Sequence, residues 1–466
     1  MLDSDRLFPT DERTRALARS LFASVETLPI ISPHGHCDPA WFAADDPFPD
    51  PARLFVVPDH YVFRMLYSQG VPLESLGVAR TDGTPVETDG RAIWRTFAEH
   101  FHLLLGTPSR LWIEHAFEHV FGIEERLDAR SADRIHDAIA DCLARPEFRP
   151  RALFDRFGIE ALATTESPLD GLDHHRAIRA SGWSGRVLTT YRPDAVVDPD
   201  TPGFTTNIAR FGELTGEDTS SWEGYLAAHR VRRGFFAAHG CTATDHGHPS
   251  AATADLPAAD AARLFARTLS GTCTPVEAET FRGQMLTEMA RMSLDDGLVM
   301  QLHPGACRDH SSLMSGRFGA NTGFDIPTRT DYVQALRPLL DAVGHDPRLT
   351  LILFGLDESA QSRELAPLAG AWPCLRLGPP WWFLDSPEGM RRFREATLET
   401  AGFYNTVGFN DDTRAFCSIP ARHDVARRVD SAHLATLVTT GRLGESDAFE
   451  LAPELAAGLA RRAYRL

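Results

Sequence analysis

The feature of this 466-residue chain that most constrains its fold is a recurring pattern of short apolar runs that end in polar residues. Eight such runs occur, at 28–36, 159–167, 186–194, 241–247, 298–308, 349–358, 374–382 and 405–414. Amphipathic segments separate most of them, and strands that alternate with helices predict a parallel sheet of the α/β class. Eight strands predict a closed (β/α)8 TIM barrel, whose active site lies at the carboxyl ends of the strands.

The first two runs are too far apart to be joined by a single loop. The sequence between them includes segments with a helical pattern, such as SRLWIEHAFEHVFG. We therefore interpret residues 60–155 as a mostly helical insertion after the first strand. The chain is therefore expected to form one distorted barrel domain over residues 1–466. A doubly wound open sheet is the alternative, but the first run is not followed by the GxGxxG turn typical of that fold.

Composition narrows the chemistry further. Asp and Glu number 64 against 47 Lys and Arg, so the net charge is −17 and an acidic surface repels phosphate backbones. We therefore expect no nucleic-acid partner. All 47 of these basic residues are arginine, because the sequence contains no lysine. This excludes a Schiff-base lysine, a P-loop lysine and a carbamylated lysine between two metal ions.

The cysteines and the first residues of the chain predict a cytoplasmic location. Seven cysteines are scattered without CxxC spacing, which favours a reducing compartment over a disulfide framework or a zinc ribbon. The first residues lack the apolar core of a signal peptide, and no apolar run approaches the ~20 residues that span a bilayer. We therefore expect a cytoplasmic protein without a membrane partner.

Histidines and an aspartate at predicted strand ends form a candidate metal site. His34 and His36 end the first run, and residues i and i+2 of a strand point to the same face, so both imidazoles can reach one ion. His303 ends the fifth run and Asp412 the eighth, which lies beside the first strand in a closed barrel. Three protein ligands and an open position are typical of a catalytic metal. The spacing does not distinguish Asp412 from Asp411.

Arginines also follow predicted strand ends, as Arg192, Arg308 and Arg414. A guanidinium group binds a carboxylate through two parallel hydrogen bonds. Three such groups at one rim indicate a small anionic substrate. Salt bridges at the rim of the barrel are the alternative explanation for each of them taken singly.

Further candidate residues are Tyr61, Asp245 and Trp381. Tyr61 lies at the start of the insertion, where a phenol can act in acid–base chemistry or donate to a developing oxyanion, unless it only packs. Asp245 ends the fourth run, where a metal-bridging lysine would lie in a binuclear version of this arrangement. Trp381 and the adjacent Trp382 can stack on the apolar face of a sugar or pack beneath a loop.

Eight motifs, taken in order, resemble the amidohydrolase superfamily and, within it, the uronate (glucuronate) isomerase family. They are PHGHCDP, DHYVFRMLYSQGV, TTESPLDGLDHH, TYRPD, AAHGCTATDHG, QLHPGACRD, PPWWFLDSPEGM and NDDTRAF…ARHD. The resemblance extends from about residue 25 to the C-terminus. It implies a distorted barrel of the amidohydrolase type. It also implies an enzyme of hexuronate catabolism that interconverts D-glucuronate with D-fructuronate and D-galacturonate with D-tagaturonate.

The resemblance also implies a cofactor and roles for the candidate residues. One divalent metal ion, zinc, would be held by His34, His36 and Asp412. The implied catalytic residues are Tyr61, Asp412, His303 and Arg414, and the implied substrate-binding residues are Arg192, Asp245, Arg308 and Trp381. The partner is a small hexuronate, and the family resemblance implies a homo-oligomer.

Isomerisation moves a proton from C2 to C1 through a cis-enediol, so it needs a base near C2 and a group that stabilises a negative oxygen. We hypothesise that Asp412 and Tyr61 are the proton-handling pair. The sequence departs from the family where Thr164–Pro168 read TTESP instead of TTDDP and where Asp411 replaces a usual Thr. The alternatives are a mononuclear metal-dependent hydrolase of lactonase or deaminase type and a non-catalytic sugar-acid binding protein.

Overall fold

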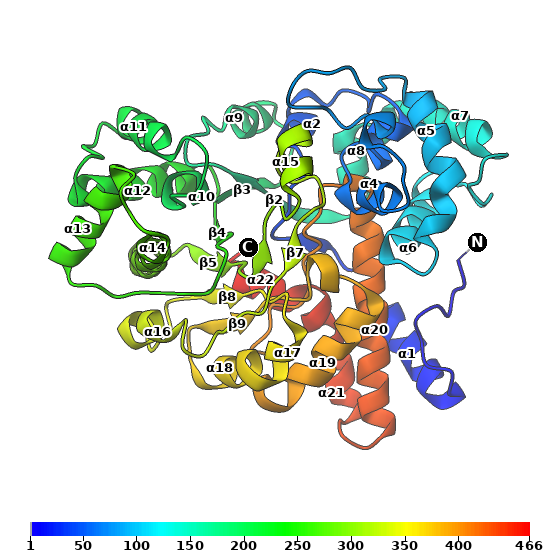
Figure 1. The fold of residues 1–466 in the computed structure, drawn as a ribbon. Helices are drawn as coiled ribbons and strands as arrows, with labels where there is room; N and C mark the ends of the chain where they lie inside the picture. Colours follow the sequence, from blue (N-terminus) through cyan, green and yellow to red (C-terminus); the bar gives the residue numbers. More distant parts are fainter. Residues whose placement is uncertain (1) are drawn as a thin grey trace.

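A seven-stranded parallel sheet lies at the centre of the computed structural model, which describes residues 2–466 (Figure 1). The strands follow one another in chain order as β1 (Ile30–Ser32), β2 (Ile159–Glu166), β3 (Val187–Tyr191), β4 (Ala243–His246), β5 (Val299–Leu302), β8 (Leu351–Leu353) and β9 (Leu375–Leu377). Each coincides with one of the first seven predicted runs. The predicted α/β class is therefore confirmed, and the sheet is curled in the manner of a barrel.

The prediction of an eighth strand at 405–414 is wrong. This segment makes only one bridge to the sheet, between Leu377 and Thr406. The backbone then enters the left-handed region at Gly408 (φ 76°) and again at Asp412 (φ 39°). An extended strand does not accommodate such dihedral angles. The run therefore has the apolar composition of a strand but not the backbone conformation of one.

The same segment nevertheless closes the gap between β9 and β1. The backbone N–H of Val407 donates to the carbonyl of Leu377 at 3.0 Å, on the β9 side. On the other side, the N–H of His36 donates to the carbonyl of Thr413 at 3.0 Å. The eighth segment of the chain therefore lies beside the first, as a closed barrel requires.

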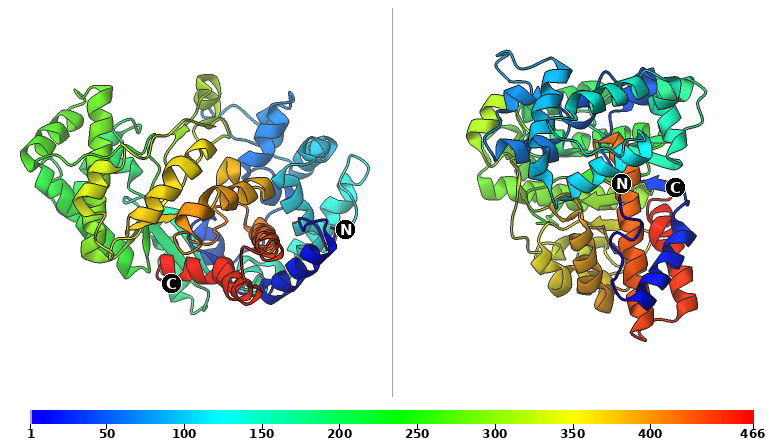
Figure 2. Two further views of the ribbon diagram at one scale, coloured as in Figure 1. Left: turned by 90° about the horizontal axis from the view of Figure 1, so that it is seen from below. Right: turned by 90° about the vertical axis from the view of Figure 1, so that its right-hand side faces the viewer.

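Helices follow each strand of the sheet in the order expected of βα units. They are α2 (Pro39–Ala44), α3 (Pro51–Phe55), α9 (Asp173–Ala180), α10 (Asp194–Val197), α11 (Phe204–Thr215), α12 (Trp222–Ala238), α13 (Ala258–Leu269), α14 (Pro275–Asp296), α16 (Arg337–Val343), α17 (Glu358–Ala360), α18 (Ala366–Ala371) and α19 (Pro387–Ala401). The long α20 (Ile419–Thr439) packs against α1 (Glu12–Val25) and α21 (Glu445–Pro453), as both views in Figure 2 show.

Residues 60–155 contain helical segments and loops but no strand. The principal helices are α4 (His60–Tyr67), α5 (Gly90–His100), α6 (Pro108–His115), α7 (Ala132–Leu143) and α8 (Pro150–Arg156). They form the blue and cyan group at the upper right of Figure 1. The carboxylate of Asp59 caps α4 by accepting a hydrogen bond from the backbone N–H of Tyr61 at 2.9 Å. This cap fixes where Tyr61 begins the helix.

The loop after β5 forms a small unit that the sequence pattern did not predict. The antiparallel strands β6 (Ala306–Cys307) and β7 (Ile326–Pro327) flank α15 (Ser312–Phe318). This unit contacts the insertion, because the backbone N–H of Thr81 donates to the carbonyl of Arg317 at 2.9 Å. Two segments far apart in the sequence therefore meet above the carboxyl ends of the strands.

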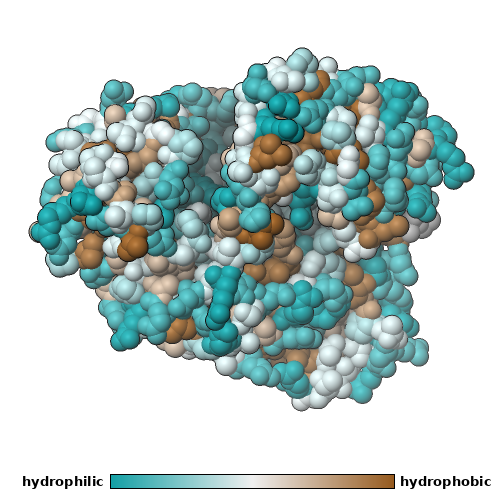
Figure 3. Space-filling view, viewed as in Figure 1, coloured by the Kyte–Doolittle hydropathy of each residue, from teal (hydrophilic) through white to brown (hydrophobic). Residues whose placement is uncertain are grey.

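The C-terminal helix α22 (Leu459–Ala463) brings Tyr464 into the core, where its hydroxyl donates to the side chain of Gln301 at 2.8 Å. The face shown in Figure 3 is largely hydrophilic and is hollowed near its upper centre. Within residues 2–466, no helix combines the length and the apolar character needed to cross a bilayer.

Candidate active site

One cavity of about 300 Å³ lies at the carboxyl ends of the strands and collects nearly all of the predicted site residues. The predicted residues that line it are His34, His36, Tyr61, Arg192, His303, Arg308, Trp381, Asp412 and Arg414. Asp245 is the predicted residue that does not line it. Because β1 ends at Ser32, the two histidines lie in the loop beyond the strand and not within it.

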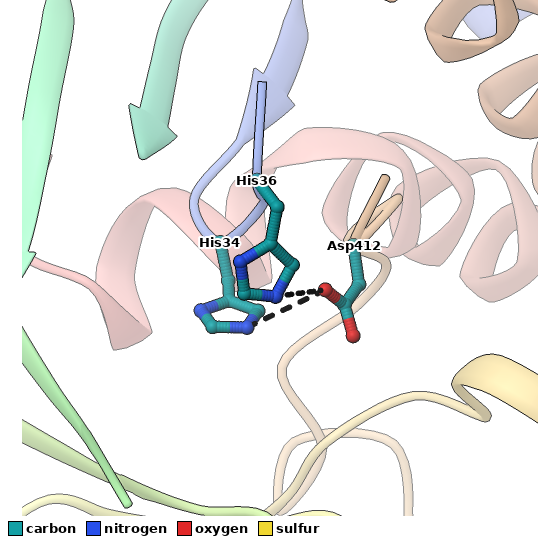
Figure 4. A group of neighbouring side chains, drawn as sticks. All are labelled: His34, His36 and Asp412. Atoms are coloured by element: carbon teal, nitrogen blue, oxygen red, sulfur yellow. Dashed lines mark ion pairs between the residues drawn. The ribbon is translucent and has the colours of Figure 1, made fainter. Parts of the chain in front are cut away.

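Three side chains converge on one point of this cavity (Figure 4). The Nε2 atoms of His34 and His36 lie 3.5 and 3.2 Å from the same oxygen, Oδ1 of Asp412. That oxygen is buried and accepts no hydrogen bond from the residues that the structure describes. Ligand atoms ~2.0–2.2 Å from a tetrahedral ion are ~3.3–3.6 Å apart, so the observed spacing fits three ligands of one metal ion.

The electrostatics of this triad suit metal binding. Burial lowers the pKa of His34 to about 4, so its imidazole is neutral at neutral pH and has a lone pair for a metal. Burial acts to raise the pKa of Asp412, but the neighbouring His34 and His36 hold it well below its usual value. A neutral imidazole beside a carboxylate is the protonation state that a divalent ion requires.

The structure distinguishes Asp412 from Asp411, which the sequence left as alternatives for the metal site. The carboxylate of Asp411 points the other way, where its Oδ2 lies 3.0 Å from Nε2 of His423 in α20. Both of these side chains are buried. Asp412 therefore faces the cavity, while Asp411 anchors the same loop to α20.

Asp245 lies behind the cavity and joins two residues that line it. Its Oδ1 accepts a hydrogen bond from Nδ1 of His303 at 2.6 Å, and its Oδ2 lies 3.0 Å from Nη1 of Arg192. Burial acts to raise the pKa of Asp245, but Arg192 and His303 hold it well below its usual value. The hydrogen bond fixes the ring of His303 with its Nε2 atom free of protein partners within residues 2–466.

His34, Asp245 and His303 form a second group whose ligand atoms are close enough to hold an ion. Arg192 places a positive charge on the carboxylate of this second group. A cation is repelled by that guanidinium, so the triad of His34, His36 and Asp412 fits a metal better.

The three predicted arginines line the cavity with different partners. Arg192 pairs with Asp194 at 2.8 Å as well as with Asp245, and Arg308 pairs with Asp325 at 3.1 Å. For the guanidinium of Arg414 the structure records no ion pair or hydrogen bond among residues 2–466. The guanidinium group nevertheless interacts electrostatically with Asp412, Asp59 and Tyr61, which lie near it. Arg414 is therefore the arginine of the cavity whose guanidinium group has no recorded ion-pair partner among residues 2–466.

Tyr61 stacks on His60 with ring centroids 4.7 Å apart and an interplanar angle of 25°. Burial raises the pKa of Tyr61 well above its usual value, so the phenol keeps its proton at neutral pH and can donate a hydrogen bond. Burial also lowers the pKa of His60 to about 3, which leaves a neutral ring whose Nε2 has no partner among the described residues. His60 was not among the predicted site residues, although it adjoins Tyr61 in the motif DHY.

Two tryptophans form one wall of the cavity. The ring of Trp381 meets that of His303 edge to face at 4.6 Å. Trp382 adopts a left-handed backbone conformation (φ 53°) and packs beneath the guanidinium of Arg308 at 4.9 Å. Strained dihedral angles of this kind cluster at functional sites. The sequence analysis missed Asp325, and the only indication of it in the sequence was its partner Arg308.

The glucuronate isomerase family model matches residues 12–457. The chain belongs to this family. A uronate isomerase of Mesorhizobium japonicum is 65% identical over 466 residues, which are 100% of this chain and 99% of the relative. The resemblance found in the sequence is therefore confirmed.

Solved structures agree with the family assignment. The crystal structure of glucuronate isomerase from Caulobacter crescentus aligns with a TM-score of 0.98 at 58% identity, covering 100% of this chain and 97% of that one. A uronate isomerase from Thermotoga maritima aligns with a TM-score of 0.92 at 28% identity, covering 100% and 99%. Because these isomerases match over the whole length, the hydrolase alternative is not favoured.

Proposed function

We propose that the chain interconverts D-glucuronate with D-fructuronate, and D-galacturonate with D-tagaturonate, as an aldose–ketose isomerase of hexuronate catabolism. The observation that carries the proposal is one cavity that unites a metal-type triad, a protonated tyrosine and an arginine without a protein partner. The test is incubation of the purified protein with each aldose, following ketose formation before and after chelation. Absence of ketose from both sugars contradicts the proposal.

We propose that His34, His36 and Asp412 hold one divalent ion, zinc. The spacing of their ligand atoms and the unpaired Oδ1 of Asp412 support this assignment. When bound, the ion supplies a Lewis acid that polarises a sugar oxygen. Two imidazole ligands favour zinc among the common divalent ions.

We propose that Asp412 and Tyr61 handle the proton. A base removes the proton at C2, the C1 carbonyl oxygen is protonated to give the cis-enediol, and a proton then returns to C1 as the C2 hydroxyl becomes a carbonyl. Asp412 is a carboxylate and can accept a proton, whereas Tyr61 is a phenol and can donate one. Arg414 lies among these residues, where its charge stabilises a negative oxygen of the enediol.

We propose that the remaining residues bind and orient the hexuronate. Arg308 lies at the exposed side of the cavity and binds the sugar carboxylate, with Arg192 as a second cation. Trp381 provides an apolar face for the sugar ring, and His303 offers Nε2 to a hydroxyl group. Because Asp245 does not line the cavity, it acts on the substrate through His303 and Arg192 by holding them in place.

We also propose that residues 1–466 form one domain, with 60–155 as an insertion into the barrel. We further propose that the protein is cytoplasmic, that it forms a homo-oligomer, and that it has no nucleic-acid or membrane partner. Tyr61 of the insertion lines the same cavity as the strand-end residues, which supports a single functional unit. The seven cysteines form no disulfide bond among residues 2–466, as a reducing compartment requires. Light scattering coupled to gel filtration tests the oligomeric state, and a monomeric mass contradicts it.

A further inference from the structure

The motif ARHD near the C-terminus contains a buried arginine that the proposed chemistry does not use. Arg422 lies in the first turns of α20 and is 1% exposed. Its Nε donates to the hydroxyl of Ser418 at 3.1 Å, and its Nη1 donates to the carboxylate of Asp385. The same Nη1 lies 3.4 Å from the backbone carbonyl of Asp411, directly before Asp412.

The guanidinium group of Arg422 lies over two aromatic rings. Its central carbon lies 3.6 Å from the ring centre of Trp112 in α6 and 5.6 Å from that of Tyr61 in α4. The rings of Trp112 and Tyr61 meet at 90° with centroids 6.1 Å apart. Arg422 does not line the cavity, whereas Tyr61, over whose ring its guanidinium group lies, does.

One side chain thus contacts three segments that converge on the cavity. The insertion supplies Tyr61, and the segment after β9 supplies Asp385, which follows Trp382 closely. The segment 405–414 supplies the carbonyl next to Asp412. These segments are distant in sequence, so the relative placement of Tyr61 and Asp412 depends on what connects them.

A purely structural role explains this arrangement poorly. Removing a guanidinium group and a carboxylate from water is energetically costly, and apolar residues of similar volume often give comparable or greater stability. The pair of Arg422 and Asp385 is buried at 1% and 3% side-chain exposure. An apolar pair at these positions could not bond the carbonyl of Asp411 and stack on Trp112 at once. The charged pair therefore fixes the orientation of the groups to which it is hydrogen-bonded, which apolar packing alone does not do.

We propose that Arg422, held by Asp385, is a positioning residue for the isomerisation. It fixes the ring of Tyr61 relative to the carboxylate of Asp412 and does not touch the substrate. This inference rests on the proposed function, in which those two residues move the proton. Displacing reacting groups by about 1 Å costs about 100-fold in rate, so the effect falls on the chemical step.

The test compares R422K with a matched control, R427K, in the metal-loaded full-length protein. Arg427 is also a buried arginine of α20, but its guanidinium binds the carbonyls of Glu26, Leu28 and Pro29, away from the cavity. We expect R422K to lower kcat for D-glucuronate by about 10- to 100-fold with KM within about threefold of wild type. The isotope effect of deuterium at C2 on kcat should rise, because proton transfer becomes slower than the other steps.

R427K should retain kcat and the wild-type isotope effect, even where both variants lose thermal stability equally. Equal kcat in R422K and R427K, or a fall in kcat that only follows loss of bound metal, overturns the inference. If R422K does not fold, D385N replaces it with the same expected results, since the amide keeps the shape but loses the charge. Wild-type protein that forms no ketose contradicts the proposed function instead, so the two failures are distinguishable.

Discussion

Nε2 of His36 lies 3.2 Å from Oδ1 of Asp412, and this contact joins the first segment of the barrel to the last. The backbone repeats the connection, because the N–H of His36 donates to the carbonyl of Thr413 at 3.0 Å. The proposed metal ligands therefore come together only when the chain has closed around the sheet. Any ion bound there stabilises the closed form over the unfolded chain.

Metal binding is therefore expected to raise thermal stability. At a free zinc concentration 100 times its Kd, the gain is about 2.7 kcal/mol, and chelation should remove it. H36A should abolish the zinc-dependent rise in Tm measured by calorimetry. The control H102A changes an exposed histidine outside the cavity and should keep the full rise. An equal response to zinc in H36A and wild type contradicts the ligand assignment.

Tyr61→Phe should lower kcat by about 10²- to 10⁴-fold, because it removes the phenolic proton from a cavity that has no second phenol. The fold should be unaffected, since no protein group among residues 2–466 is recorded as bonding the Tyr61 hydroxyl. Steady-state kinetics and Tm measure the two effects. The matched control is Tyr67→Phe on the same helix, whose ring packs against Phe324. Full turnover by Tyr61→Phe excludes it from proton transfer.

The sequence predicted the sheet well because a parallel strand buried on both faces leaves a nearly continuous apolar run. Strands β5 (VMQL) and β8 (LIL), for example, are buried at every residue. His34 and His36 lie near each other for a reason other than the strand periodicity on which the sequence analysis relied. The strand ends at Ser32, and the two rings meet at 82° from a loop instead of lying side by side along a strand.

Other features depend on backbone dihedral angles or on distant partners, which spacing does not encode. The left-handed conformation at Asp412 (φ 39°) turns its side chain into the cavity and leaves Asp411 facing His423. Arg422 acquires its place from Asp385 and Trp112, which lie far from it in sequence. The sequence ARHD does not by itself show what Arg422 contacts.

The arginines of the cavity should differ in kinetic effect. Arg414 has no protein anion in contact among residues 2–466 and lies near Asp412 and Tyr61, so R414Q should mainly lower kcat. Arg308 is held by Asp325 at the exposed side, so R308Q should mainly raise KM for D-glucuronate, by about 10-fold or more. Michaelis–Menten parameters of both variants distinguish the roles. Equal effects on kcat and KM in both contradict the separation.

Glu166 gives the protein a pH dependence that is separate from catalysis. The carboxylate is buried at the end of β2, where it accepts a hydrogen bond from the hydroxyl of Thr189. Burial raises the pKa of Glu166 from 4.5 to about 7. Between these two values the folded protein holds a proton that the unfolded chain has released. The free energy of unfolding therefore falls as pH rises from about 4.5 to 7, by up to about 3 kcal/mol from this group.

Glu166→Gln removes this titration and keeps the shape of the side chain. The variant should therefore become more stable relative to wild type as pH rises from 5 to 8, measured by urea unfolding at several pH values. The matched control is Glu160→Gln on the same strand. Hydrogen bonding to Arg461 lowers the pKa of Glu160, so its contribution is already complete at pH 5 and its difference from wild type should stay constant. A constant difference for Glu166→Gln as well would mean that the folded protein ionises Glu166 below pH 5. The hydrogen bonds that the Glu166 carboxylate accepts would then offset the effect of its burial on the pKa.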